Sequence, residues 1–152
     1  MSVYPRPLWV NHSRGAIMKI YWQYSSAIEL GIKNIDAQHK ELMEKANKLN
    51  DQVDGKALSE VTTDIARFLA QYVLDHFQEE EAFLREVNYP YYDEHIKLHD
   101  GFRAFIQERL NKLDQNTISY SDYYDISRML NDWIMDHISR ADRAIARYLK
   151  GI

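Results

Sequence analysis

The chain has 152 residues, 45% of them apolar and 28% charged, which is enough for one globular domain with a buried core. The formal net charge of -4 argues against nucleic acid as a partner, because proteins that bind it carry a basic face. The sequence has no cysteine, which excludes disulfides, zinc–thiolate sites and iron–sulfur clusters, so any metal must be bound through nitrogen and oxygen.

Residues 1–17 differ in character from the rest of the chain. They contain two prolines and the polar break Asn11-His12-Ser13, and no apolar run of signal-peptide length. No run anywhere approaches the roughly 20 apolar residues of a membrane span. We therefore expect a cytoplasmic protein with an N-terminal extension of unknown role, 1–17, and one domain, 18–152.

Four segments repeat apolar residues at helical spacing, and each predicts one amphipathic helix. The first inward stripe runs through Ile35, His39, Leu42, Ala46, Leu49 and Val53. The second runs through Ile65, Leu69, Tyr72, His76, Glu80, Phe83 and Val87. The third runs through His95, His99, Phe102, Ile106, Leu110 and Leu113. The fourth follows the capping pattern Ser119-Tyr120-Ser121-Asp122 and runs through Ile126, Leu130, Trp133, Ile134, His137, Ala141, Ile145 and Tyr148.

Three short turn-rich stretches, 50–55, 88–90 and 114–117, separate the four segments. Short connections join antiparallel neighbours, and strand-type alternation of β-branched residues is absent. The sequence therefore predicts an all-α fold, an antiparallel up-down-up-down four-helix bundle with an extended N-terminal arm. No further apolar stripe is evident on these helices, so we expect a monomer.

Five histidines and two carboxylates on the predicted helices are the candidate functional residues. A single histidine on an apolar face is usually a hydrogen-bonded core residue. Burying a polar group without a partner costs about 1–3 kcal/mol, so seven such groups would exhaust the stability of a domain, about 5–15 kcal/mol. A shared metal centre satisfies them together. The candidate ligands are His39, His76, Glu80, His95, His99, His137 and Asp142.

The spacing of these residues supports shared ligation. Two pairs lie four residues apart and so share a helix face, His76 with Glu80 and His95 with His99. His137 and Asp142 lie five apart, which is a rotation of about 140° on an ideal α-helix. That spacing fits one site if Asp142 reaches sideways to a second metal, or if the helix is distorted locally, for example by a π-bulge.

A donor count predicts one open coordination position. Five imidazoles and two carboxylates that each bridge two metals give nine contacts, and a bridging oxo or hydroxo group adds two. Two octahedral metals need twelve contacts, which leaves one position for a small ligand such as a diatomic molecule. Imidazole with carboxylate suits iron among the redox metals, although zinc, manganese and copper use the same ligand types.

The candidate ligands stand in four motifs, Ile35-Asp36-Ala37-Gln38-His39, His76-x3-Glu80, His95-x3-His99 and His137-x4-Asp142. The flanking residues include Trp22, Gly31-Ile32, Asn88-Tyr89-Pro90 and Trp133. Together these residues resemble the hemerythrin family, in particular its bacterial single-domain form, over roughly residues 18–150.

The resemblance implies reversible oxygen binding, for storage, transport or delivery of dioxygen, by a protein that is not an enzyme. It implies two iron ions bridged by an oxo or hydroxo group and by Glu80 and Asp142. One iron would be bound by His95, His99 and His137, and the other by His39 and His76. Oxygen would bind at the iron with two histidines, where the open position lies.

Apolar residues one helical turn from the ligands are the expected wall of the oxygen pocket: Leu42, Phe77, Trp133, Ile134 and Ile138. Residues at this spacing are also ordinary core residues, so both interpretations stay open. Charged residues beside the motifs, among them Glu79 and Glu81, are interpreted as solvated helix surface. His12 belongs to no ligand spacing.

Other functions use the same fold. A ferritin-like di-iron oxidase or peroxidase-type enzyme would carry Glu-x-x-His pairs, which this sequence lacks. Iron-sensing or nitrosative-stress-repair proteins of the fold usually end in His-x3-Glu, whereas this chain has His137-x4-Asp142. An oxygen or redox sensor would need an output module or a partner surface, and we identify neither. A plain interaction domain would leave the four matched spacings unexplained.

Overall fold

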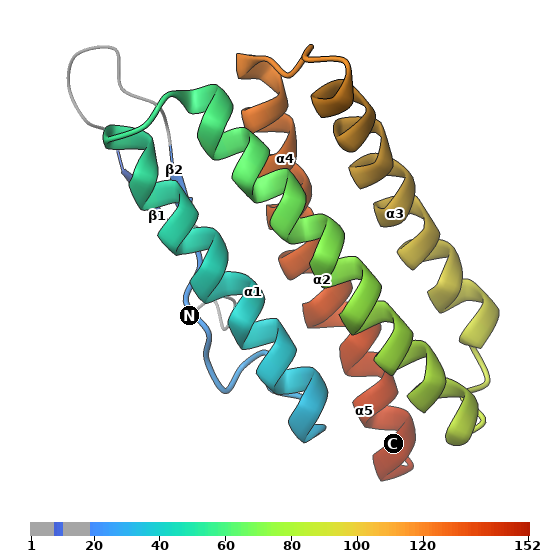
Figure 1. Cartoon of the computed structure of the whole chain (residues 1–152). Coiled ribbons are helices and arrows are strands. Elements are labelled where there is room, and N and C mark those ends of the chain that lie inside the picture. The colour runs from blue at the N-terminus through green and yellow to red at the C-terminus, as the bar shows by residue number, and fades with distance from the viewer. Residues whose placement is uncertain (1–7, 11–18) are drawn as a thin grey trace.

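The computed structural model describes residues 8–10 and 19–152 of the chain. The helical elements are α1 (Lys33–Asp51), the short 3-10 turn η1 (Gln52–Asp54), α2 (Leu58–Glu86), α3 (Tyr92–Asp114), α4 (Tyr120–Asp132), the π-helical segment η2 (Trp133–Asp142) and α5 (Arg143–Lys150). The last three follow one another without a break and form the fourth helix of the bundle (Figure 1). Successive helices run in opposite directions, which confirms the predicted up-down-up-down four-helix bundle.

The N-terminal arm contributes a short hairpin beside α1. Strand β1 (Leu8–Val10) pairs antiparallel with β2 (Lys19–Tyr21), and Leu8 lies opposite Tyr21. These strands were not predicted, because strands of three residues are too short to show the alternation that indicates a strand. The hairpin crosses the predicted boundary between extension and domain, and that boundary remains a prediction. Most of the predicted extension, with His12, lies outside the described residues.

Three helices end in the same backbone conformation. Asn88, Asn116 and Gly151 have positive φ angles of 52°, 54° and 71°. In each case the next residue donates its N–H to a carbonyl five residues earlier, as in Tyr89 to Leu84 at 3.0 Å. This is the Schellman arrangement, which satisfies carbonyls that a helix end leaves free. It places the chain reversals after α2 and α3 within the turn-rich stretches predicted from the sequence.

The predicted inward stripes form the core of the bundle. Leu42, Leu69, Ile106 and Ile134 are each at most 1% exposed. Several other stripe positions, among them Val87 and Leu113, are only half-buried, and Tyr148, the last position of the fourth stripe, is 39% exposed at the end of the bundle. Within the described part of the chain, no helix has the length and apolar content needed to cross a membrane.

Asp36 fixes the loop that leads into α1. Its buried carboxylate accepts hydrogen bonds from the backbone N–H groups of Leu30, Gly31 and Ile32 at 2.8, 2.8 and 3.1 Å. Gly31 has a φ of 82°, a conformation that favours glycine. Asp36 therefore sets where α1 begins, and with it the position of His39 on the first turns of that helix.

Replacing Asp36 with alanine is expected to lower the free energy of unfolding by about 3 kcal/mol, because the change leaves three N–H groups without their charged acceptor. Urea denaturation followed by circular dichroism measures this. Asp136→Ala is the matched control, since Asp136 is 65% exposed and pairs with Arg140 at 3.5 Å, a contact worth about 0.5 kcal/mol. Equal losses in the two variants would contradict a specific role for Asp36.

Asp122 closes a capping box at the start of α4. One carboxylate oxygen accepts the Ser119 N–H at 2.8 Å, and the other accepts from Lys112 Nζ at 2.7 Å. Burial alone would raise the pKa of Asp122, but the hydrogen bonds from Lys112 and Ser119 outweigh burial and hold this pKa below its ordinary value. The predicted capping pattern is therefore present, with Asp in the position usually held by Glu.

Because the pKa of Asp122 is lower in the folded than in the unfolded chain, its contribution to stability is complete above the unfolded pKa of about 3.9 and is lost as the pH falls through the folded pKa. Asp122→Asn is therefore expected to cost about 1 kcal/mol of unfolding free energy at pH 7. The gap between variant and wild type should shrink below about pH 4. Urea denaturation at pH 7, 5 and 3 measures the gap, and a gap that stays constant would contradict this explanation.

Candidate metal centre

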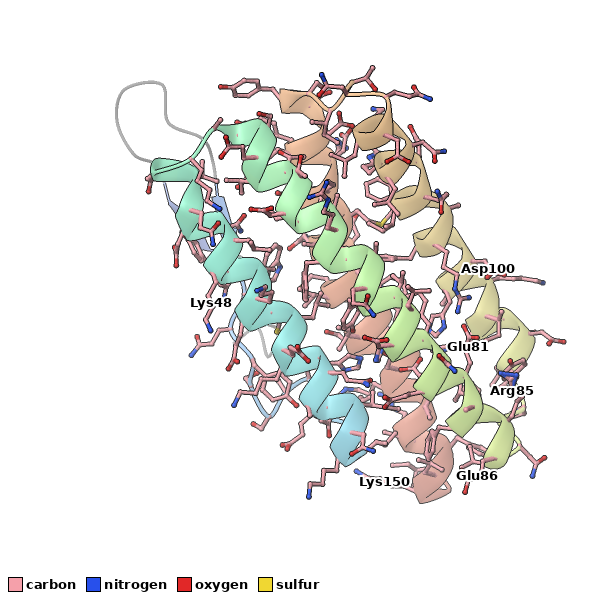
Figure 2. The ribbon with its side chains drawn as sticks, viewed as in Figure 1. Lys48, Glu81, Arg85, Glu86, Asp100 and Lys150 are labelled. Carbon is pink, nitrogen blue, oxygen red and sulfur yellow. The ribbon has the colours of Figure 1, made fainter. Side chains whose placement is uncertain are left out.

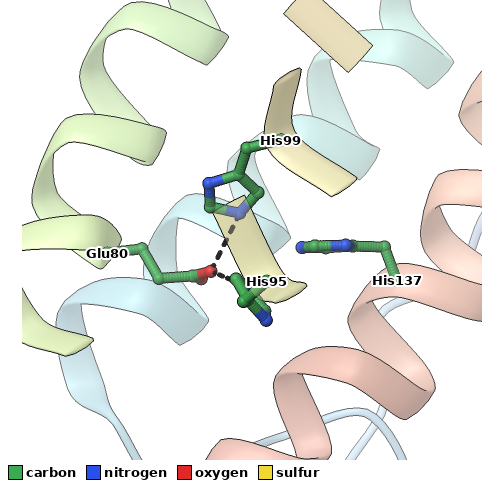
Figure 3. A group of neighbouring side chains, drawn as sticks. All are labelled: Glu80, His95, His99 and His137. Atoms are coloured by element: carbon green, nitrogen blue, oxygen red, sulfur yellow. Dashed lines mark hydrogen bonds and ion pairs between the residues drawn. The ribbon is translucent and has the colours of Figure 1, made fainter. Parts of the chain in front are cut away.

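Seven ligand-type side chains from all four helices of the bundle meet at one buried point. They are His39 on α1, His76 and Glu80 on α2, His95 and His99 on α3, and His137 and Asp142 on η2. None of them is more than 5% exposed. Figure 3 shows Glu80, His95, His99 and His137 pointing toward one another from three of the helices. The structure thus brings together every ligand candidate named from the sequence.

The seven side chains form two overlapping groups, and within each group the ligand atoms lie within 4.8 Å of one another. The first group is Glu80, His95, His99 and His137, and the second is His39, His76, Glu80 and Asp142. Glu80 belongs to both. Asp142 also links them, because its two oxygens lie 3.1 Å from Nε2 of His39 and 3.0 Å from Nε2 of His137. The two carboxylates therefore lie between a set of three imidazoles and a set of two.

All five imidazoles face the carboxylates through Nε2, at distances of 2.6–3.4 Å. Two ligand atoms bound at right angles to a first-row metal at about 2.1 Å would be about 3.0 Å apart. Most of these contacts are not hydrogen bonds. Nε2 of four rings and both oxygens of Asp142 are buried with no hydrogen-bond partner among the described residues, the four rings being His39, His76, His99 and His137. These buried nitrogen and oxygen atoms have the spacing of metal ligands and lack hydrogen-bond partners, which fits the binding of cations among them.

The π-helical segment η2 explains the five-residue spacing of the last motif. In a π-helix, hydrogen bonds join residues five apart, so such residues lie above one another. The Ser139 hydroxyl follows the same register and donates to the carbonyl of Ile134 at 2.9 Å. His137 and Asp142 are the fifth and tenth residues of this segment. Of the two explanations that the sequence allowed, a local π distortion is therefore present.

Protonation in the cluster follows burial and the two carboxylates. Burial lowers the pKa of His76 to about 3 and holds the pKa of His137 below its ordinary value. Burial would also lower the pKa of His95, but the carboxylates of Asp142 and Glu80 close to its Nε2 outweigh burial and raise this pKa to about 9. Burial likewise opposes ionisation of both carboxyl groups, yet the surrounding histidines keep their pKa values low. Most of these groups already have the protonation state that metal ligation needs, whereas His95 would release a proton.

Two ligand imidazoles make side-chain contacts outside the cluster that were not predicted from the sequence. Nδ1 of His76 lies 2.7 Å from Oε1 of Gln38, and Nδ1 of His99 lies 2.9 Å from Oε1 of Glu81. The interpretation of Glu81 as solvated surface was wrong, because its side chain is 13% exposed and also accepts from Arg103 at 2.6 Å. Arg103 lies four residues after His99, a spacing that could have indicated a shared partner.

All five residues named for the pocket wall are buried in the main core cluster: Leu42, Phe77, Trp133, Ile134 and Ile138. Two of them stack on ligand rings. The ring centres of Phe77 and His99 are 3.9 Å apart, with an angle of 6° between the ring planes. The ring centres of Trp133 and His137 are 3.6 Å apart, with an angle of 12° between the planes. These aromatic rings pack against the three-histidine side of the cluster and restrict rotation of two of its imidazoles.

Tyr72 is a further residue beside the cluster, and its place in the second inward stripe predicted only a core residue. Its ring stacks on His76 at 4.9 Å and 18°. Its hydroxyl is buried and has no hydrogen-bond partner among the described residues. The nearby carboxylates add to burial in raising the pKa of Tyr72 well above its ordinary value, so the hydroxyl stays protonated. Tyr72 thus covers His76 much as Trp133 covers His137.

A four-helix bundle with a buried cluster of histidines and carboxylates defines a metal-binding helical-bundle protein. Comparison with known proteins narrows this class. The family model described as the hemerythrin HHE cation binding domain matches residues 30–149. The chain therefore belongs to the hemerythrin family, as the motifs indicated.

Individual relatives agree with the family match. A bacteriohemerythrin from Campylobacter jejuni is 30% identical over 119 residues, covering 75% of this chain and 84% of the relative. Bacteriohemerythrins from Pseudomonas aeruginosa and Stenotrophomonas maltophilia are each 28% identical, over 81% and 86% of this chain and 76% and 82% of their own lengths. No solved structure matches the chain significantly.

Proposed function

We propose that the protein binds dioxygen reversibly at a non-haem di-iron centre and serves in oxygen storage, transport or delivery without being an enzyme. One observation carries the proposal: five imidazole Nε2 atoms and two carboxylates occupy two overlapping groups in one buried site. The sharing of Glu80 between the groups, and the contacts of Asp142 with both, support two metal positions rather than one.

In this proposal the two positions have different ligands. His95, His99 and His137 would hold one iron, and His39 and His76 would hold the other. Glu80 and Asp142 would be shared between the two, together with an oxo or hydroxo group. Two iron ions bound here would supply the electrons for reversible binding of a diatomic ligand. The two-histidine position keeps one coordination site free for that ligand, by the donor count made from the sequence.

The remaining residues of the site bind, orient and exclude water. Each carboxylate is held between rings from different helices, so the bundle itself sets the separation of the two positions. The five buried apolar residues of the pocket wall would keep water from the bound ligand: Leu42, Phe77, Trp133, Ile134 and Ile138. A dry pocket favours release of an intact ligand over its further reaction with solvent.

The names of the relatives support this function, since each is a bacteriohemerythrin. The order of ligands, ending in His137-x4-Asp142, supports the oxygen-binding branch over the iron-sensing one. We also propose that the protein acts as a monomer in the cytoplasm. A protein partner is not part of the proposal.

The test is to prepare the chain reduced and without oxygen, to assay iron per chain, and to record visible absorption while oxygen is admitted and removed. The proposal predicts two irons per chain and a charge-transfer band that appears with oxygen and disappears when oxygen is removed. His39→Ala should lose the band, and His12→Ala, which changes a histidine outside every motif, should keep it. Irreversible oxidation with turnover of a reductant would favour an oxidase, and a chain that holds only zinc would overturn the assignment of the site.

A further inference from the structure

The outer nitrogens of two ligand imidazoles have side-chain acceptors, and the acceptors differ in charge. Nδ1 of His99 faces the carboxylate of Glu81 at 2.9 Å, whereas Nδ1 of His76 faces the amide oxygen of Gln38 at 2.7 Å. Nδ1 of His39 and Nδ1 of His137 are buried with no hydrogen-bond partner within the described part of the chain.

Both acceptors fix the tautomer of the ring that they contact. A carboxylate can only accept, so Nδ1 of His99 carries the proton and Nε2 keeps its lone pair for the cluster. The amide of Gln38 is oriented by Glu79, which accepts from Gln38 Nε2 at 2.8 Å. The amide oxygen therefore faces His76, whose Nδ1 is the donor. In both rings Nε2 is left free to bind metal.

The two acceptors do not affect their rings equally. A carboxylate attracts the Nδ1 proton more strongly than a neutral amide does, which makes the opposite nitrogen a better electron donor. The metal position served by His99 would therefore be backed by a negative charge. The position served by His76 would not, because the charged carboxylate of Glu79 contacts the amide nitrogen of Gln38 and not the imidazole.

Arg103, on α3, holds the carboxylate of Glu81 in place. Nη2 of Arg103 lies 2.6 Å from it, and Nη1 of the same residue lies 2.9 Å from Asp100. Arg103 also lies over the ring of Phe77, at 5.0 Å from its centre. Figure 2 shows Glu81 on α2 and Asp100 on the adjoining helix α3. Arg103 thus fixes the Glu81 carboxylate, whose Oε1 contacts Nδ1 of His99 directly.

We infer that Glu81 and Gln38 are positioning residues that make the two metal positions unequal, the three-histidine position having the more electron-rich ligand set and so the tighter hold on metal. Neither residue reaches the metal; each acts through Nδ1 of a ligand imidazole. The inference rests on the proposed binding of two metals by the seven residues, and it adds which position is filled first and is the more easily oxidised.

Two variants exchange the acceptors without a large change of shape. Glu81→Gln makes the acceptor of His99 neutral. Gln38→Glu combined with Glu79→Gln exchanges amide and carboxylate beside His76 and leaves the net charge unchanged. Glu86→Gln, on an exposed position of the same helix, removes the same charge as Glu81→Gln without touching a ligand. Circular dichroism checks that each variant folds.

Anaerobic titration of the metal-free chain with Fe²⁺ alone measures the two binding steps. Glu81→Gln should weaken the tighter step about tenfold and leave the weaker one within about twofold. The double variant should strengthen the weaker step. In the iron-loaded chain, Glu81→Gln should raise the reduction potential by about 59 mV, the equivalent of a tenfold change for one electron, and the double variant should lower it.

Equal behaviour of Glu81→Gln and Glu86→Gln would overturn the inference, since net charge alone would then explain the effect. A shift of both acceptor variants in the same direction would also overturn it. Failure of the proposed function is a separate result. A chain that binds two metals but no oxygen, with the acceptor variants shifting the two steps as expected, supports the inference and not oxygen carriage. A chain that binds fewer than two metals contradicts both.

Discussion

Glu80→Gln is expected to abolish binding of the metal pair, with a loss of more than about 100-fold in affinity for at least one ion. Glu80 belongs to both ligand groups, and its oxygens lie 2.6 Å from Nε2 of His95 and 3.4 Å from Nε2 of His76. Removing a group that orients a ligand costs about 10–100-fold in metal affinity, and loss of a shared ligand should exceed that range. Iron per chain after gel filtration measures the effect.

The control for this prediction is Glu86→Gln, which changes the same residue type at an exposed position of α2. It should bind iron as the wild type does. Circular dichroism of both metal-free variants separates loss of ligation from loss of fold. Two irons per chain in Glu80→Gln would show that this carboxylate does not bridge.

Removal of metal is expected to lower the midpoint of thermal unfolding by roughly 15–30 °C. Each ion present at 1,000 times its dissociation constant stabilises the folded chain by about 4 kcal/mol, so two ions give about 8 kcal/mol. For a chain of this size each kcal/mol corresponds to about 2–4 °C. The physical source is the cluster itself, since Nε2 of four of its imidazoles and both oxygens of Asp142 are buried without a hydrogen-bond partner among the described residues.

Thermal scans of chelated and iron-loaded protein measure this difference. Glu80→Gln serves as its control, because a variant that binds no metal pair should show a much smaller shift on addition of iron. An identical midpoint for chelated and loaded wild type would mean that the ligands are satisfied without metal. That outcome would remove the physical argument for a centre at this site.

The helices and their order could be predicted because amphipathic spacing is a local property of the chain. The stripe from Ile35 to Val53 is buried along its whole length, since each member follows from the period alone. The ends of α2 and α3 were predicted for a similar reason, as Asn88 and Asn116 tolerate the positive φ that a helix end requires. The hairpin of the arm had no such signal.

The π-helical segment shows where local pattern is insufficient. Residues Trp133–Asp142 contain neither glycine nor proline, so nothing in their composition marks a distortion. The spacing of His137 and Asp142 indicated that an ideal α-helix would not bring both into one site, but a long reach by Asp142 explained the spacing as well. Choosing between the two required the packing of η2 against the other helices.

Glu81 and Gln38 were missed because their roles depend on pairs of helices. Glu81 follows a ligand by one position, which on an isolated helix points away from the cluster. It is covered because α3 presents His99 and Arg103 to it. The pocket wall is a different case, since burial of residues such as Ile138 is the same for an ordinary core residue and for the wall of an oxygen pocket. The assignment of these residues to an oxygen pocket remains a prediction.

The most direct test of the central claim is a crystal structure of the iron-loaded chain with anomalous scattering recorded at the iron edge. We predict two iron peaks inside the bundle, one bonded to Nε2 of three histidines and the other to Nε2 of two, namely His95, His99 and His137 against His39 and His76. Both should also be bonded to Glu80 and Asp142. A single peak, or an iron bound by residues outside these seven, would contradict the claim.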